Sequence, residues 1–236
     1  MMRVLAIETS GRSGSVALAD GSRVVAEASF GQGLRHAAEL LPTIDRLTRE
    51  HGWTPASVTH VFVSVGPGSF TGLRVGVTLA KTIAMATGAT LVAVPTARVL
   101  AANAPAEARE VVVVLDAKRG QIFTARFTRE AAGDDWHEAE PARLDTPAAA
   151  LATAGRPVYV IGEGVPYHAD AIAAAGDGVV VSDSSCAVAR AAALVPLGIA
   201  MTERGETADP FTLTPLYVRR PEPEEKRLAA EAAKSG

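Results

Sequence analysis

The chain has 236 residues, of which 48% are hydrophobic and 21% charged, and its formal net charge at pH 7 is −3. A chain of this length can bury a sizeable core and divides naturally into two subdomains of about a hundred residues each. The arginines are scattered rather than gathered in a basic stripe, which argues against nucleic acid as the main binding partner. The single cysteine, Cys186, excludes an internal disulfide and suits a reducing cytoplasm.

The first hundred residues predict an α/β unit. The opening apolar run meets Glu8 after only four residues, too few for a signal peptide or a membrane span, so we expect a cytoplasmic protein without membrane contact. Asp20-Gly21 between apolar runs predicts a tight hairpin. The elements expected in this half are strands at 3–8, 14–19, 23–29, 61–65 and 90–94 and helices at 34–50, 71–87 and 96–103.

The loop and helix at 66–87 carry the most unusual pattern in this half. Ser69 is a candidate N-cap and Gly88 a candidate stop, and the small residues between them recur every fourth position and share one helical face: Gly72, Gly76, Ala80 and Ala84. A phosphate-binding loop would need a lysine directly after its glycines, and none occurs before Lys81. Two interpretations remain, tight packing of the ridge on the chain's own sheet or docking of a partner helix on it, and we favour the second.

The second half repeats the first. Residues 4–8 are echoed by residues 112–116, and each run ends in a carboxylate before a polar turn and a second strand. We therefore expect a duplicated α/β fold of two lobes, with the carboxylates facing one cleft. The expected divisions are a first lobe at 1–105, a reduced second lobe at 106–185, a returning helix and segment packing on the first lobe at 186–220, and a mobile tail at 221–236.

Further along, we expect an irregular edge at 134–140, a short helix at 146–153, a strand at 158–161, a weak helix at 165–174 and a longer helix at 186–202.

The paired carboxylates Glu8 and Asp116 suggest a site that holds magnesium and a nucleotide phosphate. The simpler alternative is that both only cap turns at strand ends. The residues expected in a vestigial nucleotide cleft are Glu8, Thr9, Ser10, Asp116, Gly120, Gly162 and Gly164. No two histidines stand three or four residues apart, and no nucleophile elbow is present, so we expect no metal, no cofactor and no catalytic residue.

Five stretches together resemble the bacterial TsaB (YeaZ) family. They are residues 5–10 (LAIETS), 35–42 (RHAAELLP), 66–76 (GPGSFTGLRVG), 116–120 (DAKRG) and 215–219 (PLYVR). The resemblance implies the duplicated fold of the actin-like ATPase (ribonuclease H-like) superfamily. It also implies a protein that is not an enzyme by itself but supports its paralogue TsaD, together with TsaE, in threonylcarbamoyl transfer. The acceptor is N6 of the adenosine beside the anticodon in tRNAs that read codons starting with A.

The same resemblance implies where partners bind. TsaD carries a metal-binding His-x-x-x-His on its first long helix, and the matching positions here are His36 and Leu40, so the metal site is broken. Family members pair with TsaD, or with themselves when alone, through the first two long helices, and they reach tRNA only through the complex. The interface residues expected here are His36, Leu40, Leu41, Gly72, Leu73, Gly76, Val77, Ala80, Ile83 and Ala84.

A rival interpretation is an ATPase or small-molecule kinase of the same superfamily, which would use Glu8 and Asp116 around a magnesium nucleotide. The short second half speaks against it, because residues 110–185 leave little room for helices that would enclose an adenine.

Overall fold

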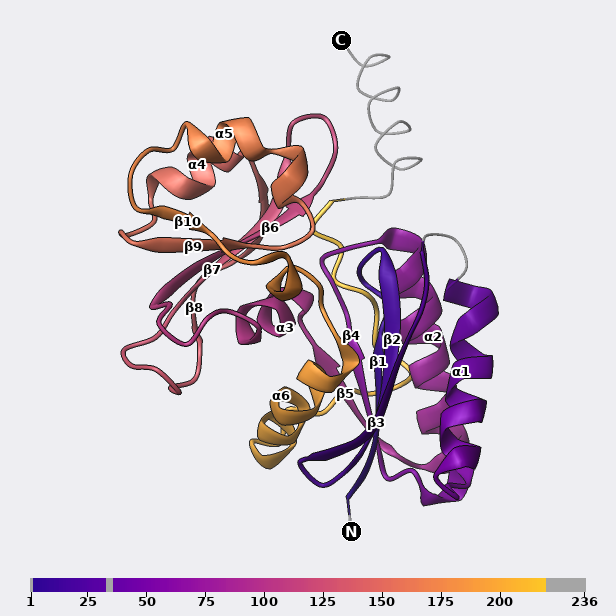
Figure 1. Ribbon diagram of the computed structural model, residues 1–236. Coiled ribbons are helices and arrows are strands. Elements are labelled where there is room, and N and C mark those ends of the chain that lie inside the picture. Colours follow the sequence, from indigo (N-terminus) through magenta and orange to yellow (C-terminus); the bar gives the residue numbers. More distant parts are fainter. Residues whose placement is uncertain (1, 33–35, 220–236) are drawn as a thin grey trace, which may run out of the picture.

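The computed structural model describes residues 2–32 and 36–219, and these residues form two five-stranded sheets (Figure 1). The strands of the first sheet are β1 (Arg3–Glu8), β2 (Ser13–Asp20), β3 (Arg23–Gln32), β4 (His60–Ser64) and β5 (Thr90–Val94). The strands of the second are β6 (Glu110–Asp116), β7 (Ile122–Thr128), β8 (His137–Asp145), β9 (Val158–Ile161) and β10 (Val179–Val181).

The two sheets have the same topology. The first has the order β3-β2-β1-β4-β5 and the second the order β8-β7-β6-β9-β10, so each strand of one half has an equivalent in the other. In both, the central strand is antiparallel to the strand that follows it in the chain and parallel to its other neighbour. The duplicated α/β fold predicted from the repeated strand and carboxylate is therefore confirmed.

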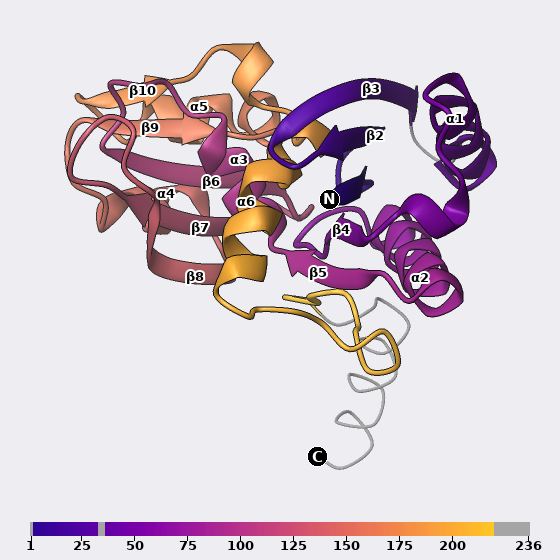
Figure 2. The ribbon, with the colours of Figure 1, turned by 90° about the horizontal axis from the view of Figure 1, so that it is seen from below.

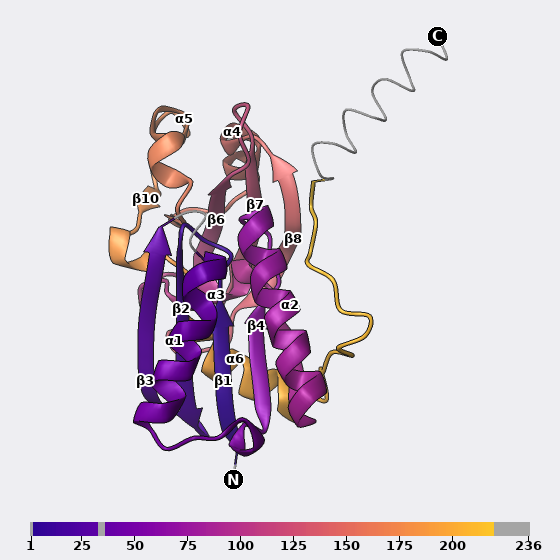
Figure 3. The ribbon, with the colours of Figure 1, turned by 90° about the vertical axis from the view of Figure 1, so that its right-hand side faces the viewer.

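Helices cover the sheets in layers. The longer helices α1 (His36–Glu50) and α2 (Phe70–Thr87) lie side by side on the outer face of the first sheet (Figure 3). Figure 2 shows α3 (Thr96–Ala102) and α6 (Ala191–Glu203) between the two sheets. The outer face of the second sheet carries α4 (Pro147–Ala152) and α5 (Ala169–Ala173). Three short 3-10 helices occur elsewhere in the chain: η2 (Pro55–Ser57), η3 (Val165–Tyr167) and η4 (Ser184–Cys186).

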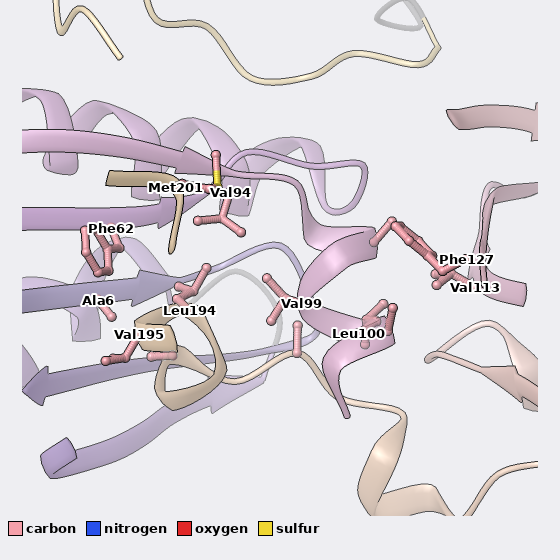
Figure 4. Close-up of a cluster of buried hydrophobic side chains, with 14 of the residues drawn as sticks. Ala6, Phe62, Val94, Val99, Leu100, Val113, Phe127, Leu194, Val195 and Met201 are labelled. Atoms are coloured by element: carbon pink, nitrogen blue, oxygen red, sulfur yellow. The ribbon is translucent and has the colours of Figure 1, made fainter. Parts of the chain in front are cut away.

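One hydrophobic core joins the two lobes. It takes side chains from the inner faces of both sheets and from α3 and α6, among them Ala6, Phe62, Val94, Val99, Leu100, Val113, Phe127, Leu194, Val195 and Met201 (Figure 4). Helix α6 lies very close to the first sheet, because a Cβ atom at Gly198 would be only 2.3 Å from the ring of Phe62. The helix that comes last in the chain thus completes the packing of the sheet that comes first.

The C-terminal strap, residues 207–219, runs along the edge of the first lobe beside α2 (Figure 3). Ala208 donates its N–H to the Leu91 carbonyl on edge strand β5 at 2.8 Å, and Leu216 donates to Val65 O at 2.7 Å. At its end Arg219 crosses to the second lobe, where its guanidinium donates to Ala117 O at 2.5 Å. The strap therefore contacts both lobes.

The second lobe differs most from the prediction. The stretch expected to be an irregular edge contains strand β8, and three valines form β10. The weak helix expected at 165–174 is split into η3 and α5, and the helix expected from residue 186 begins only at Ala191, after η4. The start of the 34–50 helix and the tail at 221–236 lie outside the described residues. Within the described residues, none of the helices combines the length and apolar character needed to cross a membrane.

Candidate functional site

Helix α2 begins and ends where its capping residues predict. The Ser69 hydroxyl accepts the Gly72 N–H at 3.2 Å, which satisfies one of the free donors of the first turn. At the other end Gly88 adopts a left-handed conformation with φ 73° and donates its N–H to Ala84 O. The loop that precedes the helix therefore fixes α2 directly after the carboxyl end of β4.

The small-residue ridge of α2 faces the chain's own sheet. Gly72, Gly76, Ala80 and Ala84 are all buried, and a Cβ atom at Gly76 would lie 2.1 Å from Oγ1 of Thr9. The expectation that this ridge is exposed for a partner helix is wrong, because the absence of side chains lets α2 approach β1 rather than another molecule. Three further residues expected at the interface are almost fully buried apolar side chains: Leu40, Leu73 and Val77.

The opposite faces of α1 and α2 form an open apolar groove, which we call the α1–α2 groove. Its volume is about 470 Å³, and it is lined by Leu40, Leu41, Arg74, Val75, Thr78, Leu79 and Thr82. Leu41 is 56% exposed, and Met85 further along α2 is 53% exposed. Of the expected interface residues, the exposed Leu41 and the almost fully buried Leu40 both line this groove. Ile83 is half-buried, and the side chain of His36 lies outside what the structure describes. Contiguous exposed apolar surface of this kind is typical of a protein–protein contact.

A second, polar pocket of about 230 Å³ lies between the lobes. It is lined by Ser10, Gly11, Arg12, Gly68, Ser69, Leu115, Asp116, Lys118, Phe123, Glu163 and Tyr167. Of the seven residues expected in a vestigial nucleotide cleft, Ser10 and Asp116 line this pocket. Gly162 and Gly164 serve a different purpose: a Cβ atom at either would come within 3 Å of the backbone of β6, so they allow the chain to pass close to that strand.

Glu8 lies behind this pocket and is fully buried. Its Oε1 accepts hydrogen bonds from the Ser10 backbone N–H at 2.6 Å and from the Ser10 hydroxyl at 2.5 Å, while Oε2 accepts none from the described part of the chain. Burial raises the pKa of this carboxyl, and the hydrogen bonds from Ser10 only partly oppose that effect. Burial that disfavours the charged form of this carboxyl also makes it a poorer ligand for magnesium.

Asp116, the equivalent residue of the second lobe, is held by neighbours from its own lobe. Its carboxylate accepts from Lys118 Nζ at 2.6 Å and lies 3.3 Å from Nε2 of His168. Partial burial would raise the pKa of Asp116, but the hydrogen bonds and charge of Lys118 outweigh it and lower the pKa. Asp116 therefore stays ionised and already paired, as the turn-capping alternative predicts.

Glu163 adds a carboxylate to the lining of the interlobe pocket. Its Oε2 accepts the backbone N–H of Arg12 at 3.0 Å, across the joint between the lobes. Free backbone N–H groups are what phosphate-binding loops offer to an anion, and here an anion of the chain itself takes that donor. This donor is therefore already occupied within the chain, and no group of three or more His, Cys, Asp or Glu side chains that could hold a metal ion occurs among the described residues.

Comparison with known proteins agrees with this picture. The model of the family described as TsaD, tRNA N6-adenosine threonylcarbamoyltransferase, matches residues 31–203, which is most of the chain. The chain belongs to this family. Within it, the chain is 26% identical over 224 residues to the tRNA threonylcarbamoyladenosine biosynthesis protein TsaB of Escherichia coli, covering 92% of this chain and 95% of that protein.

Two further relatives of the same kind complete the comparison. The Bacillus subtilis protein of the same name is 34% identical over 126 residues, 53% of this chain, and the match spans just 55% of that relative's length. The solved structure of YeaZ from Pseudomonas aeruginosa superposes with a TM-score of 0.77 at 24% identity, covering 92% of this chain and all of that one. That likeness shows the fold, which is the duplicated two-lobed α/β fold expected from the sequence.

Proposed function

We propose that this chain is a subunit of the machinery that makes threonylcarbamoyladenosine in tRNA, and that it acts by binding and stabilising a TsaD-type protein. The names of the E. coli and B. subtilis relatives support the process. This chain matches the model of the TsaD transferase family. That match supports a TsaD-type partner whose fold is similar to the fold of this chain. In this proposal the acceptor is N6 of the adenosine next to the anticodon in tRNAs for codons that begin with A.

The observation that carries the proposal is the α1–α2 groove. A leucine with 56% of its surface exposed, on a helix pair whose other side is fully packed, is best explained by a partner that covers it. The inner ridge of α2 cannot serve this purpose, because Gly76 and its neighbours are buried. We therefore place the contact on the outward faces of α1 and α2 rather than on the glycines.

In this proposal the chain performs no reaction by itself. Its interlobe pocket holds Asp116 and Glu163 in internal hydrogen bonds, and the position matching TsaD's second histidine is Leu40, whose side chain is 1% exposed in the core. The same groove would join two copies of this chain when TsaD is absent. TsaE would enter only in the larger complex, tRNA would be reached through TsaD, and the assembly would work in the cytoplasm.

The test is the affinity for purified TsaD, measured by calorimetry with variants of exposed apolar residues. Leu41→Asp should weaken binding at least about tenfold, because it places a charge in an apolar contact. Val181→Asp is the matched control, since Val181 is 54% exposed on β10 in the other lobe, and it should bind like the wild type. Equal affinity of Leu41→Asp and the wild type, with unchanged thermal unfolding, would show that the groove is not the contact.

A further inference from the structure

An aromatic and arginine cluster lies beside the α1–α2 groove, and one of its members comes from the C-terminal strap. Phe70 at the start of α2 and Tyr217 in the strap have ring centroids 5.3 Å apart, with an interplanar angle of 39°. The guanidinium carbon of Arg74 lies 3.8 Å from the centroid of Phe70 and 5.9 Å from that of Tyr217. Arg74 Nε also donates a hydrogen bond to the Tyr217 hydroxyl at 3.0 Å. We call these three residues the Arg74 cluster.

The strap holds Tyr217 firmly in this position. The residue before it, Leu216, donates its N–H to Val65 O at 2.7 Å, and Lys81 of α2 donates from Nζ to Leu213 O at 2.8 Å. Both aromatic rings of the cluster are nevertheless 38% exposed. The surface is thus rigid and apolar and carries an oriented cation, which reduces the conformational entropy lost when a partner binds.

The charge that α2 contributes to this surface is positive. Arg74 also lines the α1–α2 groove and is the only charged residue among the described residues of that lining. Helix α2 carries Arg74 and Lys81 and no acidic residue, and among the described residues no carboxylate lies within ion-pair distance of Arg74. A complementary surface would therefore bring a carboxylate to Arg74.

We propose that the end of the C-terminal strap around Tyr217 is part of the docking surface and that the Arg74 cluster is its energetic centre. The partner it fits is a helical face of the TsaD-type protein that is apolar around one acidic side chain, with the carboxylate placed on the outer edge of the Arg74 guanidinium. Tyrosine and arginine are the residue types that most often dominate binding energy at protein interfaces. This inference rests on the proposed function, and it adds a third element to the surface formed by the two helices.

The test uses the full chain and purified TsaD and compares four variants by calorimetry. Tyr217→Ala and Arg74→Ala should each weaken binding about tenfold or more, as expected for residues at the centre of a contact. Phe211→Ala is the matched control, because Phe211 is an aromatic residue of the same strap, 75% exposed, and should leave the affinity unchanged. Tyr217→Phe keeps the ring and removes only the hydroxyl that orients Arg74, so it should cause a smaller loss than Tyr217→Ala.

Salt dependence distinguishes an ion pair from a purely structural effect. Wild-type affinity should fall as sodium chloride is raised from about 0.05 to 0.5 M, because salt screens exposed charge pairs, and Arg74→Ala should remove most of that dependence. If Arg74→Ala and Tyr217→Phe bind like the wild type while Leu41→Asp does not, the Arg74 cluster is not the centre and the groove alone is the interface. If Leu41→Asp also binds normally, the proposed function fails with it.

Discussion

The Thr9 hydroxyl oxygen lies where a side chain at Gly76 would have to begin, 2.1 Å from the position of a Cβ atom. Thr9 follows β1 and is fully buried, so α2 packs against the end of the central strand at backbone distance. Two residues far apart in the chain thereby fix the height of α2 above the first sheet.

Gly76→Ala should therefore destabilise the protein rather than change its surface. Overpacking of a buried site costs about 1 to 3 kcal/mol, partly offset by about 1 kcal/mol of better helix propensity. Urea unfolding measures the change, and Thr82→Ala on the exposed side of α2 is the control. Combining Gly76→Ala with Thr9→Ala removes the clashing atom and should restore most of the lost stability. A double variant no more stable than Gly76→Ala would contradict this account of the ridge.

Glu8 predicts an unusual pH dependence of stability. Because burial raises its pKa in the folded state, the protonated carboxyl stabilises the fold at low pH, and this contribution is lost as the pH rises through the folded pKa. Glu8→Gln keeps an acceptor for the two Ser10 donors and cannot ionise. The free energy of unfolding can be measured with urea at a series of pH values above the usual glutamate pKa. As the pH rises, that of Glu8→Gln should increase relative to that of the wild type. Parallel pH profiles would mean that folding does not raise the pKa of Glu8.

The interlobe pocket predicts that the purified chain does not hydrolyse ATP. The Arg12 N–H is already bonded to Glu163, and Glu8 lies behind the pocket rather than in its lining. Phosphate release from magnesium ATP should equal the buffer background, and the Glu8→Gln variant should release no more phosphate than the wild type. Hydrolysis that disappears in Glu8→Gln would instead support the kinase or ATPase interpretation.

Substitution of Arg219 should change the local dynamics of the C-terminal strap. Its guanidinium ties the strap to Ala117 O and to the Gln121 side chain in the turn between β6 and β7. Arg219→Ala should free the end of the strap from the second lobe, so the Leu216 amide, which donates to Val65 O, should exchange its hydrogen faster. Hydrogen exchange followed by mass spectrometry measures this, with peptides of β1 as the internal control. Unchanged exchange across residues 207–219 would show that the first lobe alone holds the strap.

The parts of the fold that the sequence predicted are those that local chemistry determines. The Asp20-Gly21 turn, the Ser69 and Gly88 caps and the apolar central strands each carry their own signal. Strands β8 and β10 lack such a local sequence signal, because β8 is a polar edge strand that contains Pro141 and β10 has only three residues. Both form because neighbouring strands offer free backbone groups.

The candidate site was harder to predict, because a ridge of small residues fits two neighbours equally well. Gly72, Gly76, Ala80 and Ala84 would permit close approach of a partner helix or of the chain's own strand, and only the burial of Thr9 beneath them decides. The outward faces of α1 and α2, which carry Leu41, Val75 and Leu79, show no distinctive sequence pattern. Tyr217 is separated from Arg74 by more than a hundred residues, so no local pattern pairs them.

The position of α6 has a consequence for synthesis on the ribosome. Phe62 and the inner face of the first sheet are covered by a helix that spans Ala191–Glu203, so most of the polypeptide must be translated before that face is sealed. A nascent chain that ends near residue 105 exposes apolar strand surface to solvent, and a fragment cut there should require a chaperone to stay in solution.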